Sequence, residues 1–93
     1  MQSDSPTVFG DRERKILEFE RNWWKYTGAK ERAIRQVFEF SATRYYHLLN
    51  DIIDLPEAVS YDPILVKRLQ RLRAFRQRQR RARRLGIRLT DNG

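Results

Sequence analysis

Residues 31–50 read ERAIRQVFEFSATRYYHLLN, and this stretch carries the strongest fold signal in the 93-residue chain. In the general twenty-residue pattern of a helix-turn-helix, the fourth, eighth, tenth, fifteenth and eighteenth positions hold the side chains that pack the two helices together. Those positions are all apolar or aromatic here: Ile34, Phe38, Phe40, Tyr45 and Leu48. The pattern therefore predicts a helix-turn-helix.

The centre of this motif combines a good helix start with an unusual turn. Ser41 stands where the second helix begins, and serine is a favoured N-cap. Arg35 replaces the usual small residue at the fifth position, and Glu39 replaces the usual glycine at the ninth. Because glycine alone adopts a left-handed backbone freely, Glu39 either tolerates that conformation or the turn has a different shape. An ordinary helical hairpin with this spacing by chance is the alternative interpretation.

Helical spacing of apolar residues predicts a first helix before the motif. We expect it to be capped by Asp11, to run to about Thr27 and to stop at Gly28. Its apolar stripe, which we expect in the core, consists of Ile16, Leu17, Phe19, Trp23, Trp24 and Tyr26.

The rest of the chain also predicts helices, over residues 29–38, 42–54 and 63–85, with a short turn of helix over 56–59. Asp62-Pro63 is a strong start for the last one, since aspartate caps and proline suits the first helical position. Gly86 is its expected stop. No segment alternates with period two for long enough to predict a strand. The fold class is therefore all-α, a small domain of three to four helices with a helix-turn-helix and a long arginine-rich C-terminal helix.

The last helix changes character along its length. Its apolar positions, Leu65, Leu69, Leu72 and Phe75, end early. We expect the front to pack on the body and the back to project or lie along something negative. The predicted organisation is a flexible arm over residues 1–10, a helix-turn-helix domain over 11–62, a basic helix over 63–86 and a flexible tail over 87–93.

The net charge of +8 is concentrated in the last third of the chain. Residues 1–62 hold nine Lys/Arg and eleven Asp/Glu, whereas residues 63–93 hold eleven Lys/Arg and a single acid, Asp91. A solvated surface helix normally mixes both signs, so a block of one sign indicates a polyanionic partner, most often nucleic acid.

Two groups of residues are the expected nucleic-acid ligands. For the DNA backbone we expect Ser41, Lys67, Arg68, Arg71, Arg73, Arg76, Arg78, Arg80, Arg81, Arg83 and Arg84. For base reading by the helix that follows Ser41, we expect Thr43, Arg44, Tyr46, His47 and Asn50. Arg44 suits a guanine edge and Asn50 suits adenine. Partial core packing of Tyr46 and a helix-end hydrogen bond of Asn50 are the structural alternatives.

Several classes of function have no support in the residues. The chain has no cysteine, one histidine (His47) and four scattered glycines, so we expect no metal site, no cofactor and no phosphate-binding glycine loop. We find no nucleophile, base and orienting group together, and therefore expect no enzyme. With neither an apolar run near 18 residues nor a signal peptide, the cytoplasm, and within it the nucleoid, is the expected location, with no membrane partner.

The run FERNWWKYTGAKERAIRQVFEFSATRYYHLLNDIID, followed by DPILVKRLQRLR and RRARRLG, resembles a small family of basic actinobacterial proteins of unassigned function. The likeness covers residues 16–86 and is most specific at Trp23-Trp24, residues 44–46, residues 49–50 and Asp62-Pro63. Family members usually have glycine where Glu39 stands. The resemblance implies a helix-turn-helix similar to the DNA-binding domains of sigma factors.

Together these observations predict a protein that binds double-stranded DNA, either a transcriptional regulator or a nucleoid-associated protein. RNA is an alternative ligand for the same charge. A protein-interaction module that binds RNA polymerase or a sigma factor is the alternative function, which an exposed Trp23 or Trp24 would favour. A homodimer is compatible with the sequence, but no leucine heptad is long enough to require one.

Overall fold

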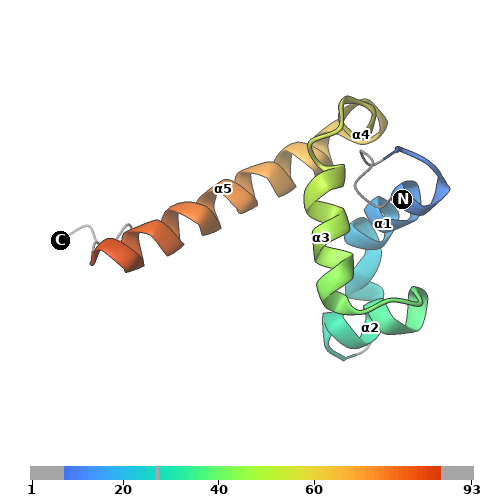
Figure 1. The fold of residues 1–93 in the computed structure, drawn as a ribbon. Helices are drawn as coiled ribbons and strands as arrows, with labels where there is room; N and C mark the ends of the chain where they lie inside the picture. The colour runs from blue at the N-terminus through green and yellow to red at the C-terminus, as the bar shows by residue number, and fades with distance from the viewer. Residues whose placement is uncertain (1–7, 27, 87–93) are drawn as a thin grey trace, which may run out of the picture.

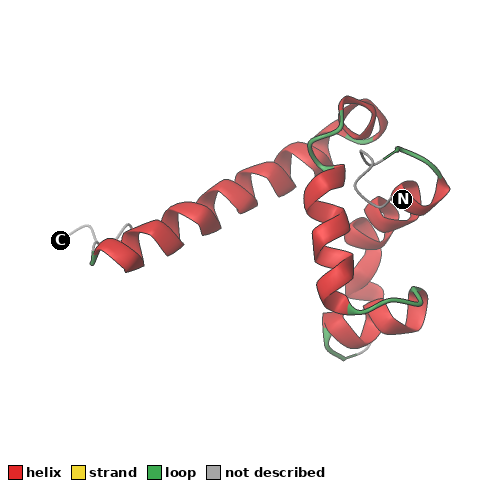
Figure 2. Ribbon diagram, in the orientation of Figure 1, coloured by secondary structure: helices red, strands yellow, loops and turns green. Residues whose placement is uncertain are grey.

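The computed structural model describes residues 8–26 and 28–86, and the regular structure in them is helical throughout (Figures 1 and 2). The elements are α1 (Asp11–Asn22), the 3₁₀ turn η1 (Trp23–Lys25), α2 (Lys30–Val37), α3 (Ala42–Ile52), α4 (Pro56–Tyr61) and α5 (Pro63–Leu85). The predicted all-α class is confirmed. The described part has five α-helices rather than three to four, because the short turn expected after Pro56 is a helix of its own.

One hydrophobic core joins α1 to α4 with the first turns of α5. The buried apolar residues are Ile16, Leu17, Phe19, Ala33, Ile34, Phe38, Tyr45, Leu49, Ile52, Ile53, Ala58, Leu65 and Val66. Three rings meet in it: Phe19 lies 5.7 Å from Phe38 and 5.6 Å from Tyr45, both edge-on, and Phe38 lies 5.5 Å from Tyr45. Aromatic pairs of this geometry add about 0.5–1.5 kcal/mol each beyond their burial.

The five packing positions of the helix-turn-helix pattern lie in or against this core. Ile34, Phe38 and Tyr45 are buried, and Phe40 and Leu48 are partly buried against them. Among the described residues, only glycines have positive φ, so Glu39 does not take the left-handed conformation. The chain leaves α2 instead through an extended Phe38, whose φ is −115° and ψ is 157°. The turn is therefore reshaped, as the missing glycine requires.

The predicted caps of the later helices are confirmed. Ser41 Oγ accepts a hydrogen bond from the Arg44 backbone N–H at 3.1 Å, and Asp62 accepts one from the Leu65 N–H. Gly86 ends α5 with φ +77°, a left-handed conformation that glycine adopts without strain.

The first helix differs from its prediction at both ends. It is capped by Gly10, whose N–H donates to the Glu13 carboxylate at 3.0 Å, so Asp11 is its first residue rather than its cap. The α-helix also ends at Asn22, well before Thr27, which lies outside the described residues. Gly28 has φ +91° but stands after η1, so it does not end α1.

The tighter turn of η1 carries the aromatic residues away from the core. Trp24 is 68% exposed and Tyr26 is 41% exposed, while Trp23 is half-buried. The prediction that these residues continue the core stripe is wrong for Trp24 and Tyr26, because the 3.6-residue period on which it depends stops at Asn22.

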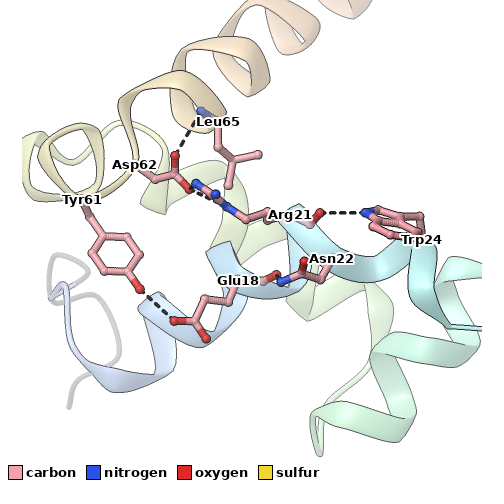
Figure 3. Close-up of polar contacts among 7 residues, drawn as sticks. All are labelled: Glu18, Arg21, Asn22, Trp24, Tyr61, Asp62 and Leu65. Carbon is pink, nitrogen blue, oxygen red and sulfur yellow. Dashed lines mark hydrogen bonds and ion pairs between the residues drawn. The ribbon is translucent and has the colours of Figure 1, made fainter.

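A polar cluster fastens α1 to the junction of α4 and α5 (Figure 3). The Arg21 guanidinium pairs with the buried Asp62 carboxylate, which also caps α5. The Tyr61 hydroxyl donates to Glu18 at 2.8 Å. These contacts join residues about forty positions apart and fix where α5 begins.

The second half of α5 extends away from the other helices (Figure 1). Leu65 is buried and Leu69 partly buried, but Leu72 and Phe75 are 42% and 44% exposed. The prediction that Leu72 and Phe75 pack on the body is therefore wrong, because α5 leaves the body near Arg73. The projection raises the radius of gyration to 15.3 Å, against about 12 Å for a compact chain of this length.

The ends of the chain are described only in part. Residues 1–7 of the predicted arm and the whole predicted tail, residues 87–93, lie outside the described residues. Within the rest of the arm, Phe9 packs against the core and its ring lies 5.4 Å from that of Tyr61. Across residues 8–26 and 28–86, none of the helices has the length and apolar character needed to cross a bilayer.

Candidate nucleic-acid interface

Helix α3 presents an exposed polar face opposite its buried one. Tyr45, Leu49 and Ile52 point into the core at helical spacing. The five residues predicted to read bases, Thr43, Arg44, Tyr46, His47 and Asn50, are all exposed. Tyr46 is the most covered by neighbours: its ring packs edge-on against Tyr45, and burial raises its pKa above the ordinary tyrosine value.

A buried carboxylate holds this helix against α1 and α2. Glu20 of α1 accepts a hydrogen bond from the Tyr45 hydroxyl at 2.5 Å and pairs with the Lys30 ammonium at 2.9 Å. Lys30 lies between two rings, 5.4 Å from the centroids of both Trp23 and Tyr46. Burial, and then the charge of Glu20, raise the pKa of Tyr45, so this hydroxyl stays a donor. These contacts thus fix the orientation of α3 from its buried side, opposite the exposed polar face.

Arg73 clamps α5 to the last turn of α3. Its guanidinium pairs with Asp54 at 2.7 Å and also donates to the Asn50 side-chain oxygen at 3.0 Å and the Asn50 carbonyl at 3.1 Å. Beside it, the Gln70 amide donates to the Ile53 carbonyl at 2.6 Å. The hydrogen bond to Asp54 raises the pKa of Arg73. The structure therefore gives Arg73 protein partners in place of the phosphate expected from its charge.

The same contacts change the expected role of Asn50. Its side-chain oxygen is already an acceptor for Arg73, whereas bidentate pairing with adenine needs both the oxygen and the amide nitrogen of an asparagine. The helix-end hydrogen bond that was the alternative for Asn50 is thus present, although its donor is a side chain of another helix.

Beyond Arg73, the basic residues of α5 stand clear of the body. Arg76, Arg78, Arg80, Arg81, Arg83 and Arg84 are exposed, and none of them forms an ion pair with another described residue. At about 100° per residue, Arg76, Arg80, Arg83 and Arg84 continue the face of Arg73. That face includes the body-facing Leu69, so it is turned toward the side on which α3 lies.

A cleft of about 690 Å³ lies between α3 and α5. Its lining residues are Glu20, Lys30, Tyr46, His47, Leu49, Asn50, Asp51, Ile53, Leu69, Arg73, Arg76, Gln77 and Arg80. Three of the predicted base-reading residues and three of the predicted backbone residues therefore meet around one concavity.

The remaining predicted residues lie outside this cleft. Thr43 and Arg44 belong to the first turn of α3, where the Arg44 guanidinium lies over the Phe40 ring at 5.9 Å. Ser41 is exposed, but its hydroxyl is used as the cap of α3. The other backbone residues outside the lining are Lys67, Arg68, Arg71, Arg78, Arg81, Arg83 and Arg84.

Sequence reasoning missed four residues that shape the site. Glu20, Lys30 and Gln77 line the cleft, and Asp54 holds Arg73. Gln77 lies four residues after Arg73 and three before Arg80, so helical spacing alone places it on their side. No local signal identifies the other three, since their partners are ten to twenty-five positions away.

Comparison with known proteins places the chain in a family but adds no activity. The searches of the curated proteins and of the solved structures found no match. The helix-turn-helix and the likeness to sigma factors stay predictions. Residues 9–81 match the family described as "Protein of unknown function (DUF3263)". Because this match spans most of the chain, the protein belongs to the DUF3263 family.

Proposed function

We propose that this protein binds double-stranded DNA, with α2 and α3 as a helix-turn-helix and α5 as a backbone-binding arm. The observation that carries the proposal is that the α5 arginines beyond Arg73 are exposed and have no acidic partner among the described residues. Six exposed guanidinium groups follow Arg73 on α5, and none of them forms an ion pair with an acid of the described residues. A phosphate backbone offers counter-charges at comparable density, and its condensed ions are released on binding.

The dimensions of α3 are compatible with groove insertion. An α-helix with its side chains is about 10–12 Å across, and the major groove is about 12 Å wide. The exposed face of α3 carries Thr43, Arg44 and His47 with no described ion pair, and side chains of these types contact base edges or phosphates. We therefore assign base reading first to these three residues. Tyr46 and Asn50 are weaker candidates, because their side chains already have contacts within the protein.

A salt titration of binding to duplex DNA tests the proposal. Fluorescence anisotropy with a labelled duplex of random sequence should give an affinity that falls steeply with salt, with a log–log slope of about −0.9 for each phosphate neutralised. Affinity that hardly changes between low and moderate salt, or no binding in dilute buffer, would contradict it. Duplex RNA of the same sequence is the comparison ligand for the RNA alternative.

The same assay separates a regulator from a nucleoid-associated protein. Selection from a random library yields a preferred site only if base contacts contribute. Arg44→Ala should then reduce the preference for that site while leaving binding to random DNA nearly unchanged. Arg76→Ala with Arg80→Ala and Arg84→Ala should instead weaken binding to all sequences alike.

The exposure of Trp24 favours a second candidate, a module that binds the transcription machinery. Its side chain is 68% exposed, and its indole N–H donates to the Arg21 carbonyl at 3.1 Å (Figure 3). Lys25 lies 5.7 Å from the ring centroid. A fixed, exposed tryptophan is typical of the residues that contribute most at protein interfaces.

Nuclease-treated binding assays with purified RNA polymerase and purified sigma factor test this candidate. Trp24→Ala should weaken complex formation at least about tenfold if the ring is a contact residue. Ile64→Ala is the control, since Ile64 is an apolar side chain that is 83% exposed and belongs to another helix, α5. Binding that disappears with nuclease, or equal affinities for the two variants, would count against a protein partner at this surface.

A further inference from the structure

The cleft between α3 and α5 has two walls of different chemistry and an apolar floor. Tyr46 and His47 form the α3 wall, and Arg76 and Arg80 form the α5 wall. Leu49, Ile53 and Leu69 line the inner part. Of the lining charges, Lys30 and Glu20 neutralise each other. The charges in the lining that have no described ion pair are then Arg76 and Arg80 on α5 and Asp51 on α3. The α5 wall is therefore the positive one.

This composition fits a sugar–phosphate strand better than a small molecule. Small-molecule pockets of about 300–1,000 Å³ are mostly apolar with a few placed polar groups, whereas this cleft is lined mainly by charged and polar side chains. A nucleic-acid strand offers phosphates to arginine and sugar faces to apolar side chains. Arginine is also suited to phosphate because its planar fork donates two parallel hydrogen bonds.

The contacts of Arg73 with the end of α3 make the cleft a preformed binding site. Arg73 ties α5 to Asp54 and Asn50 through four hydrogen bonds, and Gln70 adds a fifth beside them. These bonds hold the middle of α5 against the end of α3, so they limit how far Arg76 and Arg80 can move away from α3. A preformed site loses less conformational entropy on binding than a flexible arm does.

We propose that this cleft holds one strand of the duplex backbone, with Arg76 and Arg80 on its phosphates, while α3 enters the adjacent groove. This inference rests on the proposed DNA binding and makes it more specific. It assigns binding to one side of α5 only. Arg71 and Arg78, about 160–180° around the helix from Arg80 and Arg76, then add only long-range attraction.

Two double variants of equal charge test the assignment. Arg76→Ala with Arg80→Ala removes two cations from the cleft, and Arg71→Ala with Arg78→Ala removes two from the other side of the same helix. None of the four residues forms a described ion pair, and alanine favours helix, so both variants should fold. Circular dichroism checks this before binding is measured.

We expect the cleft variant to bind a duplex at least about tenfold more weakly. The slope of its log affinity against log salt concentration should be less steep by about 2. The control variant should lose less than about threefold in affinity and keep its slope. Equal losses in the two variants, with the parent protein binding normally, would overturn the cleft assignment but leave DNA binding intact. A parent protein that binds no duplex would overturn both.

Photo-crosslinking gives a second, independent readout. A photoreactive side chain placed at Gln77, which lines the cleft, should crosslink to the duplex. The same group at Phe75, which is exposed and lies about 160° around the helix from Gln77, should not. Equal crosslinking from both positions would contradict a strand seated between α3 and α5.

Discussion

Glu20 of α1 is a buried carboxylate whose hydrogen-bonding partners come from two other helices. At 6% exposure it has lost most of its contact with water, and burying a charge is costly unless the charge is paired. Tyr45 from α3 and Lys30 from α2 supply the donors. The position of α3 therefore depends on one acid that the spacing of apolar residues does not reveal.

Tyr45→Phe should destabilise the fold by about 1–3 kcal/mol, because it removes one donor from a buried carboxylate without changing the ring packing. Chemical denaturation measures the loss. Tyr46→Phe is the control, since no described hydrogen bond uses the Tyr46 hydroxyl, and it should stay within about 0.5 kcal/mol of the parent. Equal stabilities of the two variants would show that the Glu20 contact contributes nothing.

Ser41 has two roles that a single substitution separates. Its hydroxyl caps α3, and its exposed position at the start of that helix is where a phosphate contact was predicted. Ser41→Ala should cost about 1 kcal/mol of stability. Ser41→Asp should keep the cap but weaken duplex binding through charge repulsion. Undiminished DNA affinity of Ser41→Asp would remove Ser41 from the interface.

At the scale of elements, sequence predicted helices best where a local cap defines them. Ser41, Asp62-Pro63 and Gly86 mark ends through hydrogen bonds or backbone geometry within a few residues, and each was predicted correctly. The end of α1 was not, because Trp23 and Tyr26 continue the apolar period by coincidence after the backbone has tightened into η1. Periodicity identifies a face, but it does not show where a helix stops.

The candidate site was predictable in its parts but not in its assembly. Exposure of Thr43, Arg44 and His47 follows from the α3 period, and the charge of α5 can be counted directly. That Arg73 binds Asp54, while Arg76 and Arg80 line a cleft, depends on how two helices cross. Contacts nineteen or more positions apart have no local signature in a single sequence.

Arg73→Gln should loosen α5 relative to α3, because it removes the ion pair with Asp54. The chain has no cysteine, so Glu31→Cys with Arg81→Cys allows a clean pair of spin labels on α2 and α5. We expect a narrow distance distribution in the parent and a broader one in the Arg73→Gln background. Arg78→Gln, which has no described ion pair, should leave the distribution narrow. An unchanged distribution in both would mean that Arg73 does not fix the angle.

At the scale of the whole molecule, the core does not need the projecting part of α5, which carries most of the cations of the proposed binding surface. The core cluster includes nothing beyond Leu69, and the last tie between α5 and the body is Arg73. A chain that ends after Ala74 should therefore unfold at nearly the temperature of the parent, measured by circular dichroism, while its affinity for duplex DNA falls by orders of magnitude. A large drop in melting temperature would show that the projecting part of α5 also supports the core.

The part of α5 that projects from the body also influences how copies of the protein approach one another. Its last twelve residues extend about 18 Å and carry six cations with no acid among them. Two such rods repel at low ionic strength, so free molecules should stay apart in dilute buffer and approach each other only as salt is added. On a shared duplex, the same repulsion would set a minimum spacing between neighbours.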